Sequence, residues 1–184
     1  MTTFSKLGCG RAMHLGLVAS LALSTGSSAF AQDRETWRCA AANGQFSRNV
    51  SPIGNKTTSI SGRITFHKAY FGHDFSSMAR IALTDRKLPD GDCRCNGIFV
   101  KAFPGYSTVG FYMLLDGEVI ELAKAPFEKP ISFNFSLDPL GQLTARVGKS
   151  NPIYKTATSR HPQRDSLTMS CSGADVSFLN VEPQ

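Results

Sequence analysis

The chain has 184 residues, of which 41% are hydrophobic and 18% are charged, with 20 Lys and Arg against 14 Asp and Glu. A hydrophobic fraction of this size supports a folded core, and the Gly and Pro residues follow no fixed period, so the composition excludes a disordered tail, a coiled coil and a collagen-like repeat. The formal net charge of +6 is spread thinly along the chain, which excludes the dense basic stripe typical of nucleic-acid-binding domains.

The first part of the chain has the layout of a secretory signal peptide. Lys6 and Arg11 precede an apolar run at 15–23, and Ala-Phe-Ala at 29–31 fits the cleavage motif. The apolar run is about half as long as a bilayer-spanning helix, so a membrane anchor is not expected. We predict a signal peptide over 1–31, cleavage before Gln32, one mature domain over 32–184 without a membrane span, and a periplasmic or extracellular location.

The mature chain contains short segments that are typical of β-strands. Residues 131–137 alternate apolar and polar side chains, and 143–147 do so again after a Pro/Gly link, which predicts a hairpin. Asp116-Gly117 joins 111–115 to 118–122, and this dipeptide is favoured in two-residue hairpin turns. Further strands are expected at 36–40, 59–66, 79–83, 98–103, 167–171 and 176–181.

The same pattern argues against long helices. Apolar residues do not recur with a 3.6-residue period over any long stretch, and 70–78 is the place where a short helix is expected. We predict an all-β fold, an antiparallel two-sheet sandwich of the jelly-roll type with at most one or two short helices.

Four cysteines remain after the signal peptide, namely Cys39, Cys93, Cys95 and Cys171. An even number of cysteines in an exported chain predicts two disulfides. A Cys93–Cys95 bridge closes a very small ring with poor geometry, so we expect Cys39 and Cys171 each to bridge to one member of that pair. Which of the two each takes stays open.

Metal binding is the alternative use of these residues. Cys93, Cys95 and Cys171 together with a histidine are a possible set of zinc ligands, but the C-x-C spacing does not match a zinc motif. Asp90 and Asp92 lie in a Pro/Gly turn that offers part of a calcium site, although a solvated turn explains them as well. We therefore expect no metal and no cofactor.

Residues 107–181 resemble the second half of the concanavalin A-like lectin and glucanase superfamily, especially its laminin-G-like branch. The likeness rests on the apolar hairpin around Asp116-Gly117, the Ile131–Val147 hairpin, and a terminal strand with Cys171-x-Gly173. The resemblance implies a curved two-sheet sandwich whose concave face or loop rim binds carbohydrate, often beside calcium. The calcium ligands of the superfamily have no assured counterparts in this sequence.

The superfamily also includes glycosidases, which makes catalysis an alternative hypothesis. Glu118 and Glu121 are two nearby carboxylates, as glycoside hydrolysis requires. Residues three apart on a strand point to opposite faces unless a bulge intervenes, so we interpret both as solvated acids. His67, His73 and His161 occur among many serines, but the sequence lacks the Gly-x-Ser-x-Gly motif of a nucleophilic serine.

Aromatic residues are the strongest indication of a ligand site. The segment 70–75 combines Tyr70, His73 and Asp74 with two phenylalanines, and Tyr106 lies in a turn after Pro-Gly. Aromatic rings pack on the apolar face of a sugar while polar groups bind its hydroxyls. We predict a non-enzymatic module that binds a glycan or envelope polysaccharide through these four residues and binds no nucleic acid. A protein-binding or inhibitory domain that uses an exposed sheet edge is the other alternative.

Overall fold

The computed structural model describes residues 34–54, 59–72, 76–85, 95–148, 153–160 and 165–184. Within these residues the regular structure consists of strands, and every strand pairing is antiparallel. The prediction of an all-β antiparallel fold is therefore confirmed. The strands are β1 (Glu35–Pro52), β2 (Ser59–Ala69), β3 (Met78–Thr84), β4 (Asn96–Ala102), β5 (Thr108–Leu115), β6 (Glu118–Pro126), β7 (Ile131–Leu137), β8 (Gln142–Val147), β9 (Ile153–Thr158) and β10 (Ser166–Pro183).

The short helix expected at 70–78 is not seen where this segment is described. The backbone N–H of Tyr70 donates to Gly173 O in β10, Gly72 has a φ of 124°, and β3 already begins at Met78. A positive φ is incompatible with a right-handed helix, and residues 73–75 lie outside the described residues. Among the described residues there is no helix of the length and apolarity that crossing a membrane requires.

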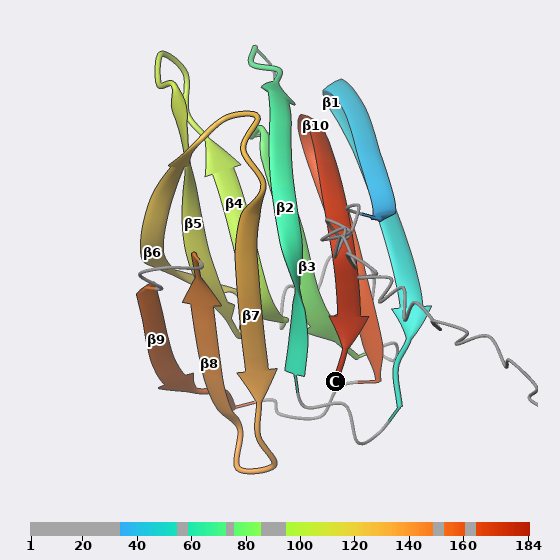
Figure 1. Cartoon of the computed structure of the whole chain (residues 1–184), viewed down its shortest axis with the longest axis vertical. Coiled ribbons are helices and arrows are strands. Elements are labelled where there is room, and N and C mark those ends of the chain that lie inside the picture. The colour runs from blue at the N-terminus through green and yellow to red at the C-terminus, as the bar shows by residue number, and fades with distance from the viewer. Residues whose placement is uncertain (1–33, 55–58, 73–75, 86–94, 149–152, 161–164) are drawn as a thin grey trace, which may run out of the picture. The chain divides into compact units, whose positions relative to one another are not determined.

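The strands form one hydrogen-bonded sheet that folds back on itself into two layers (Figure 1). The first layer contains residues 35–41 of β1 and 174–183 of β10, followed by β2, β7, β8 and β9. The second layer contains residues 46–52 of β1 and 166–172 of β10, followed by β3, β4, β5 and β6. Both long strands therefore belong to both layers.

The two layers are joined at a bend shared by β1 and β10. Gly173 in β10 has a φ of 52°, and residues 42–45 of β1 lie opposite it as an irregularity in the register. Glycine adopts this left-handed conformation without a steric penalty, so the strand turns sharply at this point and keeps its pairing. The bend explains why the two strands expected at 167–171 and 176–181 are one continuous β10.

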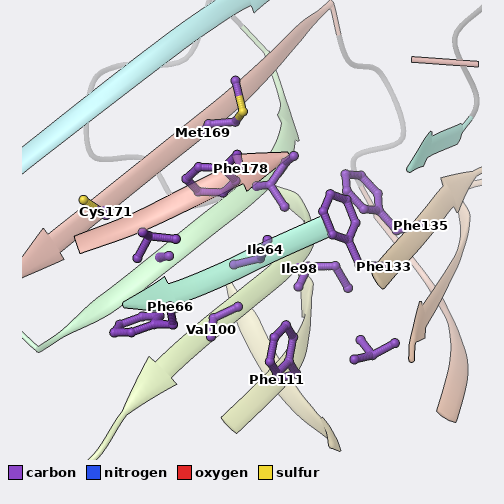
Figure 2. Packing of buried hydrophobic residues seen from close by; sticks show 14 of the residues in the cluster. Ile64, Phe66, Ile98, Val100, Phe111, Phe133, Phe135, Met169, Cys171 and Phe178 are labelled. Carbon is purple, nitrogen blue, oxygen red and sulfur yellow. The ribbon is translucent and has the colours of Figure 1, made fainter. Parts of the chain in front are cut away.

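The core fills the space between the layers, where the inward side chains of both layers meet (Figure 2). The alternation that predicts β7 places Phe133, Phe135 and Leu137 inward, opposite Ile98 and Phe111 of the second layer. The largest fully buried side chains are Phe66, Phe111, Phe135, Phe178, Ile60, Ile64, Ile81, Leu83, Ile98, Met113, Leu143 and Val100.

Both predicted hairpins are confirmed. Asp116 and Gly117 have φ angles of 50° and 91°, as a two-residue turn with positive φ at both central positions requires. β7 pairs with β8 as expected. β9 was not predicted, because Lys155 interrupts its alternation; Ser159, which follows it, donates from Oγ to Asp116 Oδ1 at 2.7 Å and ties the first layer to the second.

The predicted disulfide pairing is wrong for Cys39 and Cys171, which are bonded to each other with Cα atoms 6.0 Å apart. The bend brings the first-layer half of β1 next to the second-layer half of β10, and both cysteines face the core. Cys95 lies instead on the outer face of the second layer, where its Sγ accepts a hydrogen bond from Arg80 Nη1 at 3.5 Å. Cys93 lies outside the described residues.

Candidate binding face

Tyr70 and Tyr106, two of the predicted ligand-binding residues, lie in loops at the same end of the sandwich. Tyr70 follows β2, and Tyr106 lies between β4 and β5. The other two, His73 and Asp74, lie outside the described residues.

Backbone hydrogen bonds hold the bases of these two loops together. The carbonyl oxygen of Gly173 accepts from Tyr70 N at 2.8 Å and from Ser77 Oγ at 2.7 Å. Ser77 O in turn accepts from Ala102 N at 3.0 Å, immediately before the β4–β5 loop. Both loops therefore start from a network fixed by the bend in β10.

The two tyrosine rings nevertheless belong to different layers. Lys68 is paired with Asp175 on the outer face of the first layer, and its ammonium lies 5.0 Å from the centre of the Tyr70 ring. Tyr106 contacts Phe103, with ring centroids 6.3 Å apart, and the Lys101 ammonium lies 5.3 Å from the Phe103 ring centre. These aromatic contacts do not join Tyr70 to Tyr106.

The surroundings of Tyr106 continue onto the outer face of the second layer. Strand pairing aligns its outward side chains in three rows, each crossing six strands from β1 to β6. In that order the middle row contains Arg48, Ser170, Arg80, Phe99, Tyr112 and Glu121. The row nearer the Tyr106 loop contains Phe46, Ser172, Met78, Lys101, Gly110 and Lys124, and the far row contains Val50, Thr168, Ala82, Gly97, Leu114 and Val119. Ser172, Ser170, Thr168, Ala82, Gly97, Gly110 and Leu114 in these rows are buried. We call the remaining residues of the three rows, together with Phe103 and Tyr106, the binding face.

An aromatic pair lies at the centre of this face. The rings of Phe99 and Tyr112 have centroids 5.9 Å apart, and Tyr112 lies over Gly110, where an added Cβ would be 2.6 Å from the Tyr112 hydroxyl. Burial, and secondarily the negative charge of Glu121, raise the pKa of Tyr112. Its hydroxyl therefore stays protonated at neutral pH and is able to donate a hydrogen bond.

A second aromatic pair extends the face to the rim. Tyr106 is 66% exposed and Phe103 is 36% exposed, and Lys101 lies between this pair and Phe99 along β4. Of these aromatic residues, Tyr106 was predicted from the sequence as a ligand contact, whereas Phe99, Phe103 and Tyr112 were not. The signal was present as an alternation, because residues 97, 99 and 101 lie on the same side of β4 and Phe103 continues their spacing just after the strand.

The alternative catalytic pair is separated by the register of β6. Glu121 lies opposite Tyr112 on the outer face, whereas Glu118 lies opposite Leu115, which packs against the core. The bulge in this pairing falls after Glu121, so it does not bring the two carboxylates to the same side. The described geometry does not offer the facing carboxylates that glycoside hydrolysis requires.

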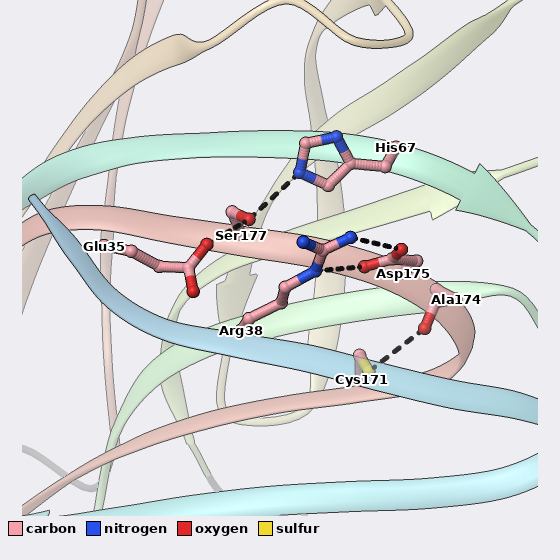
Figure 3. A network of polar contacts seen from close by, with 7 residues as sticks. All are labelled: Glu35, Arg38, His67, Cys171, Ala174, Asp175 and Ser177. Atoms are coloured by element: carbon pink, nitrogen blue, oxygen red, sulfur yellow. Dashed lines mark hydrogen bonds and ion pairs between the residues drawn. The ribbon is translucent and has the colours of Figure 1, made fainter. Parts of the chain in front are cut away.

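A serine and a histidine lie next to each other on the outer face of the first layer (Figure 3). His67 Nε2 is 3.0 Å from Ser177 Oγ, which donates to Glu35 Oε2 at 2.8 Å. Because an ionised carboxylate only accepts hydrogen bonds, the serine proton points to Glu35, and His67 Nε2 carries the proton that it shares with Ser177. The imidazole is then a donor rather than the base that a nucleophilic serine needs. The three residues act as a structural link between β1, β2 and β10.

Beside this link, Arg38 and Asp175 form an ion pair with N–O distances of 3.0 and 2.9 Å (Figure 3). The hydrogen bonds from Arg38 are the main reason why the pKa of Asp175 is lowered. A carboxyl group with a lowered pKa stabilises the fold at pH values above its ordinary pKa. This stabilisation is lost as the pH falls through the pKa that the group has in the folded state. We expect the free energy of unfolding to fall less steeply between about pH 5 and pH 2 in Asp175→Asn than in the wild type, as measured by urea titrations. Arg38→Gln should flatten the profile in the same way, and a profile as steep as that of the wild type would contradict this assignment.

Metal binding finds no support in the described part of the chain, which contains no group of three or more His, Cys, Asp or Glu side chains placed to hold an ion. Asp90 and Asp92, considered for calcium, lie outside the described residues. What the binding face offers chemically is aromatic surface beside ammonium, guanidinium, carboxylate and phenol groups.

No family model and no curated protein sequence matches the chain, but solved structures do. The chain is similar to Scytalido-glutamic peptidase with a peptide-based transition-state analogue, with a TM-score of 0.51, 12% identity, and coverage of 76% of this chain and 74% of that one. It is similar to a carbohydrate-binding module from Bacillus subtilis, with a TM-score of 0.44, 12% identity and coverage of 81% and 88%. It is also similar to a legume lectin-like domain from Entamoeba histolytica, with a TM-score of 0.47, 12% identity and coverage of 77% and 79%.

These likenesses concern the fold. At such identities one architecture hosts many unrelated activities, so the peptidase match says nothing about what this chain does. The likeness at a TM-score of 0.51 agrees with the two-layered antiparallel sheet that the sequence predicts.

Proposed function

We propose that the mature chain is an exported, non-enzymatic module that binds glycans of the cell envelope through its binding face. One observation carries the proposal. Two aromatic pairs, Phe99 with Tyr112 and Phe103 with Tyr106, occur on the outer side of a single layer with Lys101 between them.

The chemistry of this face suits a sugar. Each sugar ring has an apolar side that packs on an aromatic ring, and hydroxyls around its edge that need hydrogen-bond partners. Tyr112 supplies a phenol, Lys101 an ammonium and Glu121 a carboxylate around the aromatic surface. Tyr106 contributes the most exposed ring of this face. Tyr70 lies beside Lys68 of the first layer, so the sugar contacts predicted for its segment, which includes His73 and Asp74, would be made outside this face.

Export rests on the sequence of residues 1–31 and on the chemistry of the cysteines. The Cys39–Cys171 disulfide supports an oxidising compartment, since disulfides are rare in reducing ones. Cleavage before Gln32 leaves 18 Lys and Arg against 14 Asp and Glu, because the segment removed contains Lys6 and Arg11 and no acid. Intact-mass measurement of exported protein tests the cleavage site.

Glycan binding is tested by removing the most exposed ring. Tyr106→Ala is expected to weaken binding to the best ligand of a glycan array about tenfold, since the lost stacking area is worth roughly 1–2 kcal/mol. The melting temperature should stay within a few degrees of the wild-type value, because Tyr106 is a surface residue. Titration calorimetry and thermal unfolding measure the two effects.

Leu140→Ala is the matched control. Leu140 is 86% exposed and lies in the β7–β8 turn, at the other end of the strands, so its removal should leave binding unchanged. Equal losses in the two variants would contradict the assignment of the face. Release of reducing sugar by the wild type, abolished in Glu118→Gln or Glu121→Gln, would favour the glycosidase hypothesis instead.

An exposed sheet edge favours protein binding as a second candidate function. Among the described residues β1 pairs only with β10, so its other edge is open along both layers. An open edge of this kind accepts an added strand from a partner. A proline at Ala40, an exposed position in the first-layer half of β1, would block strand addition there without touching the binding face. A partner bound by the wild type but not by Ala40→Pro, with sugar binding retained, would support this alternative.

A further inference from the structure

The cations of the binding face are arranged as a pair across three strands. Lys101 of β4 and Lys124 of β6 both lie opposite Gly110 of β5, on the outer side of the second layer. Neighbouring strands are about 4.8 Å apart, so these two backbone positions are separated by about 10 Å. Because Gly110 has no side chain, the ring of Tyr112 from the same strand lies over it, between the two lysine positions.

Among the described residues, acidic side chains do not neutralise the charge of these two lysines. Neither Lys101 nor Lys124 forms an ion pair with a described residue. The three rows contain the cations Arg48, Arg80, Lys101 and Lys124, and Glu121 is the one acid that the described residues place in them. Glu121 faces Tyr112 in the middle row, one row farther from the Tyr106 loop than the two lysines.

The Lys101 ammonium also lies beside aromatic surface, and Lys124 belongs to the row that the Tyr112 ring covers. Lys101 Nζ lies over the Phe103 ring, next to Tyr106, and Lys124 shares its row with Gly110, over which Tyr112 lies. A sugar stacked on Tyr106 or Tyr112 therefore meets a positive charge at its edge. A neutral sugar would leave both ammonium groups without an anionic partner, whereas an acidic sugar would supply one.

We infer that the glycan recognised by this face is an acidic polysaccharide, whose carboxylate or sulfate groups pair with Lys101 and Lys124 while its sugar rings pack on Tyr106 and Tyr112. This inference rests on the proposed glycan-binding function and names the class of ligand. The arrangement requires charges on the polymer at intervals that reach both lysines, so a single acidic monosaccharide should bind weakly.

The test compares each acidic polymer with its neutral counterpart on the mature protein. The probes are polygalacturonate beside its carboxyl-reduced form, and dextran sulfate beside dextran, measured by titration calorimetry at low and physiological salt. We expect each acidic polymer to bind at least about tenfold more tightly than its neutral form, with the difference shrinking as salt screens the charges. The two pairs distinguish a carboxylate ligand from a sulfate ligand.

Charge-removing variants assign the effect to the two lysines. Lys101→Gln and Lys124→Gln should each weaken binding of the acidic polymer about threefold to tenfold, as expected for the loss of one charged hydrogen bond. Binding of the neutral polymer should weaken less than binding of the acidic polymer, because glutamine still offers hydrogen bonds to sugar hydroxyls but no charge. Lys155→Gln, an exposed lysine of β9 in the first layer, removes the same charge elsewhere and should leave both affinities at the wild-type value.

The outcomes separate this inference from the function on which it rests. Equal affinity for the acidic and neutral forms would overturn the inference and leave glycan binding intact. If the protein bound none of the polymers and no glycan of an array, both the inference and the proposed function would be overturned. Equal binding of a DNA duplex, lost in the same lysine variants, would mean that the face attracts any polyanion and would overturn the assignment to polysaccharides.

Discussion

Replacing Cys39 and Cys171 together by alanine is expected to lower the free energy of unfolding by about 5 kcal/mol. The bond joins positions 132 residues apart, and a covalent link across so long a segment removes much of the conformational entropy of the unfolded chain. For a domain of this size the loss corresponds to a drop in melting temperature of about 10 to 20 °C. Thermal and urea unfolding of the variant and of the wild type measure it.

Reduction provides the control for this prediction. Dithiothreitol should destabilise the wild type by a similar amount and should have little further effect on the Cys39→Ala/Cys171→Ala variant. Peptide mapping under non-reducing conditions should recover a linked pair of peptides containing Cys39 and Cys171. A pair that links either cysteine to Cys93 would contradict the described geometry, as would a wild type whose stability does not change on reduction.

The strands were predictable from the sequence where alternation is uninterrupted, as in β7 and in the hairpin at Asp116-Gly117. The bend could not be predicted. The residues on each side of Gly173 alternate as a strand does, and a glycine between two such runs is typical of a loop between two strands. The cysteine pairing depends on that bend. Sequence reasoning compares distances along the chain, and it could not show that β1 and β10 cross together from one layer to the other.

The binding face was predictable only in part, for a similar reason. A cluster of aromatic residues close together in sequence, such as Tyr70 and its neighbours, is visible without a structure. Phe99 and Tyr112 come from different strands and become neighbours only through the β4–β5 register, in which they lie opposite each other. The sequence alone does not give that register. Gly110 gave no chemical signal either, since its role is to leave space for Tyr112 between two lysines.

Gly97→Ala is expected to destabilise the protein by about 3 kcal/mol or more. A Cβ at this position would lie 2.2 Å from Ile81 O and 2.7 Å from Ala82 Cα, both in the backbone of β3. Neither atom belongs to a side chain that is able to rotate away, so β3 and β4 must separate at the centre of the second layer. Urea unfolding measures the loss, and glycan binding should weaken too, because Phe99 lies two residues farther along the same side of β4.

Two other glycines show that the neighbouring atoms, rather than the residue type, set this cost. Gly54→Ala adds a Cβ with no heavy atom within 4 Å, so stability should change by less than about 1 kcal/mol. Gly110→Ala would meet the Tyr112 ring, which is a side chain and is able to move, so it should impair glycan binding more than stability. If Gly97→Ala proved as stable as Gly54→Ala, the close approach of β4 to β3 would be wrong, and so would the register that sets Phe99 opposite Arg80.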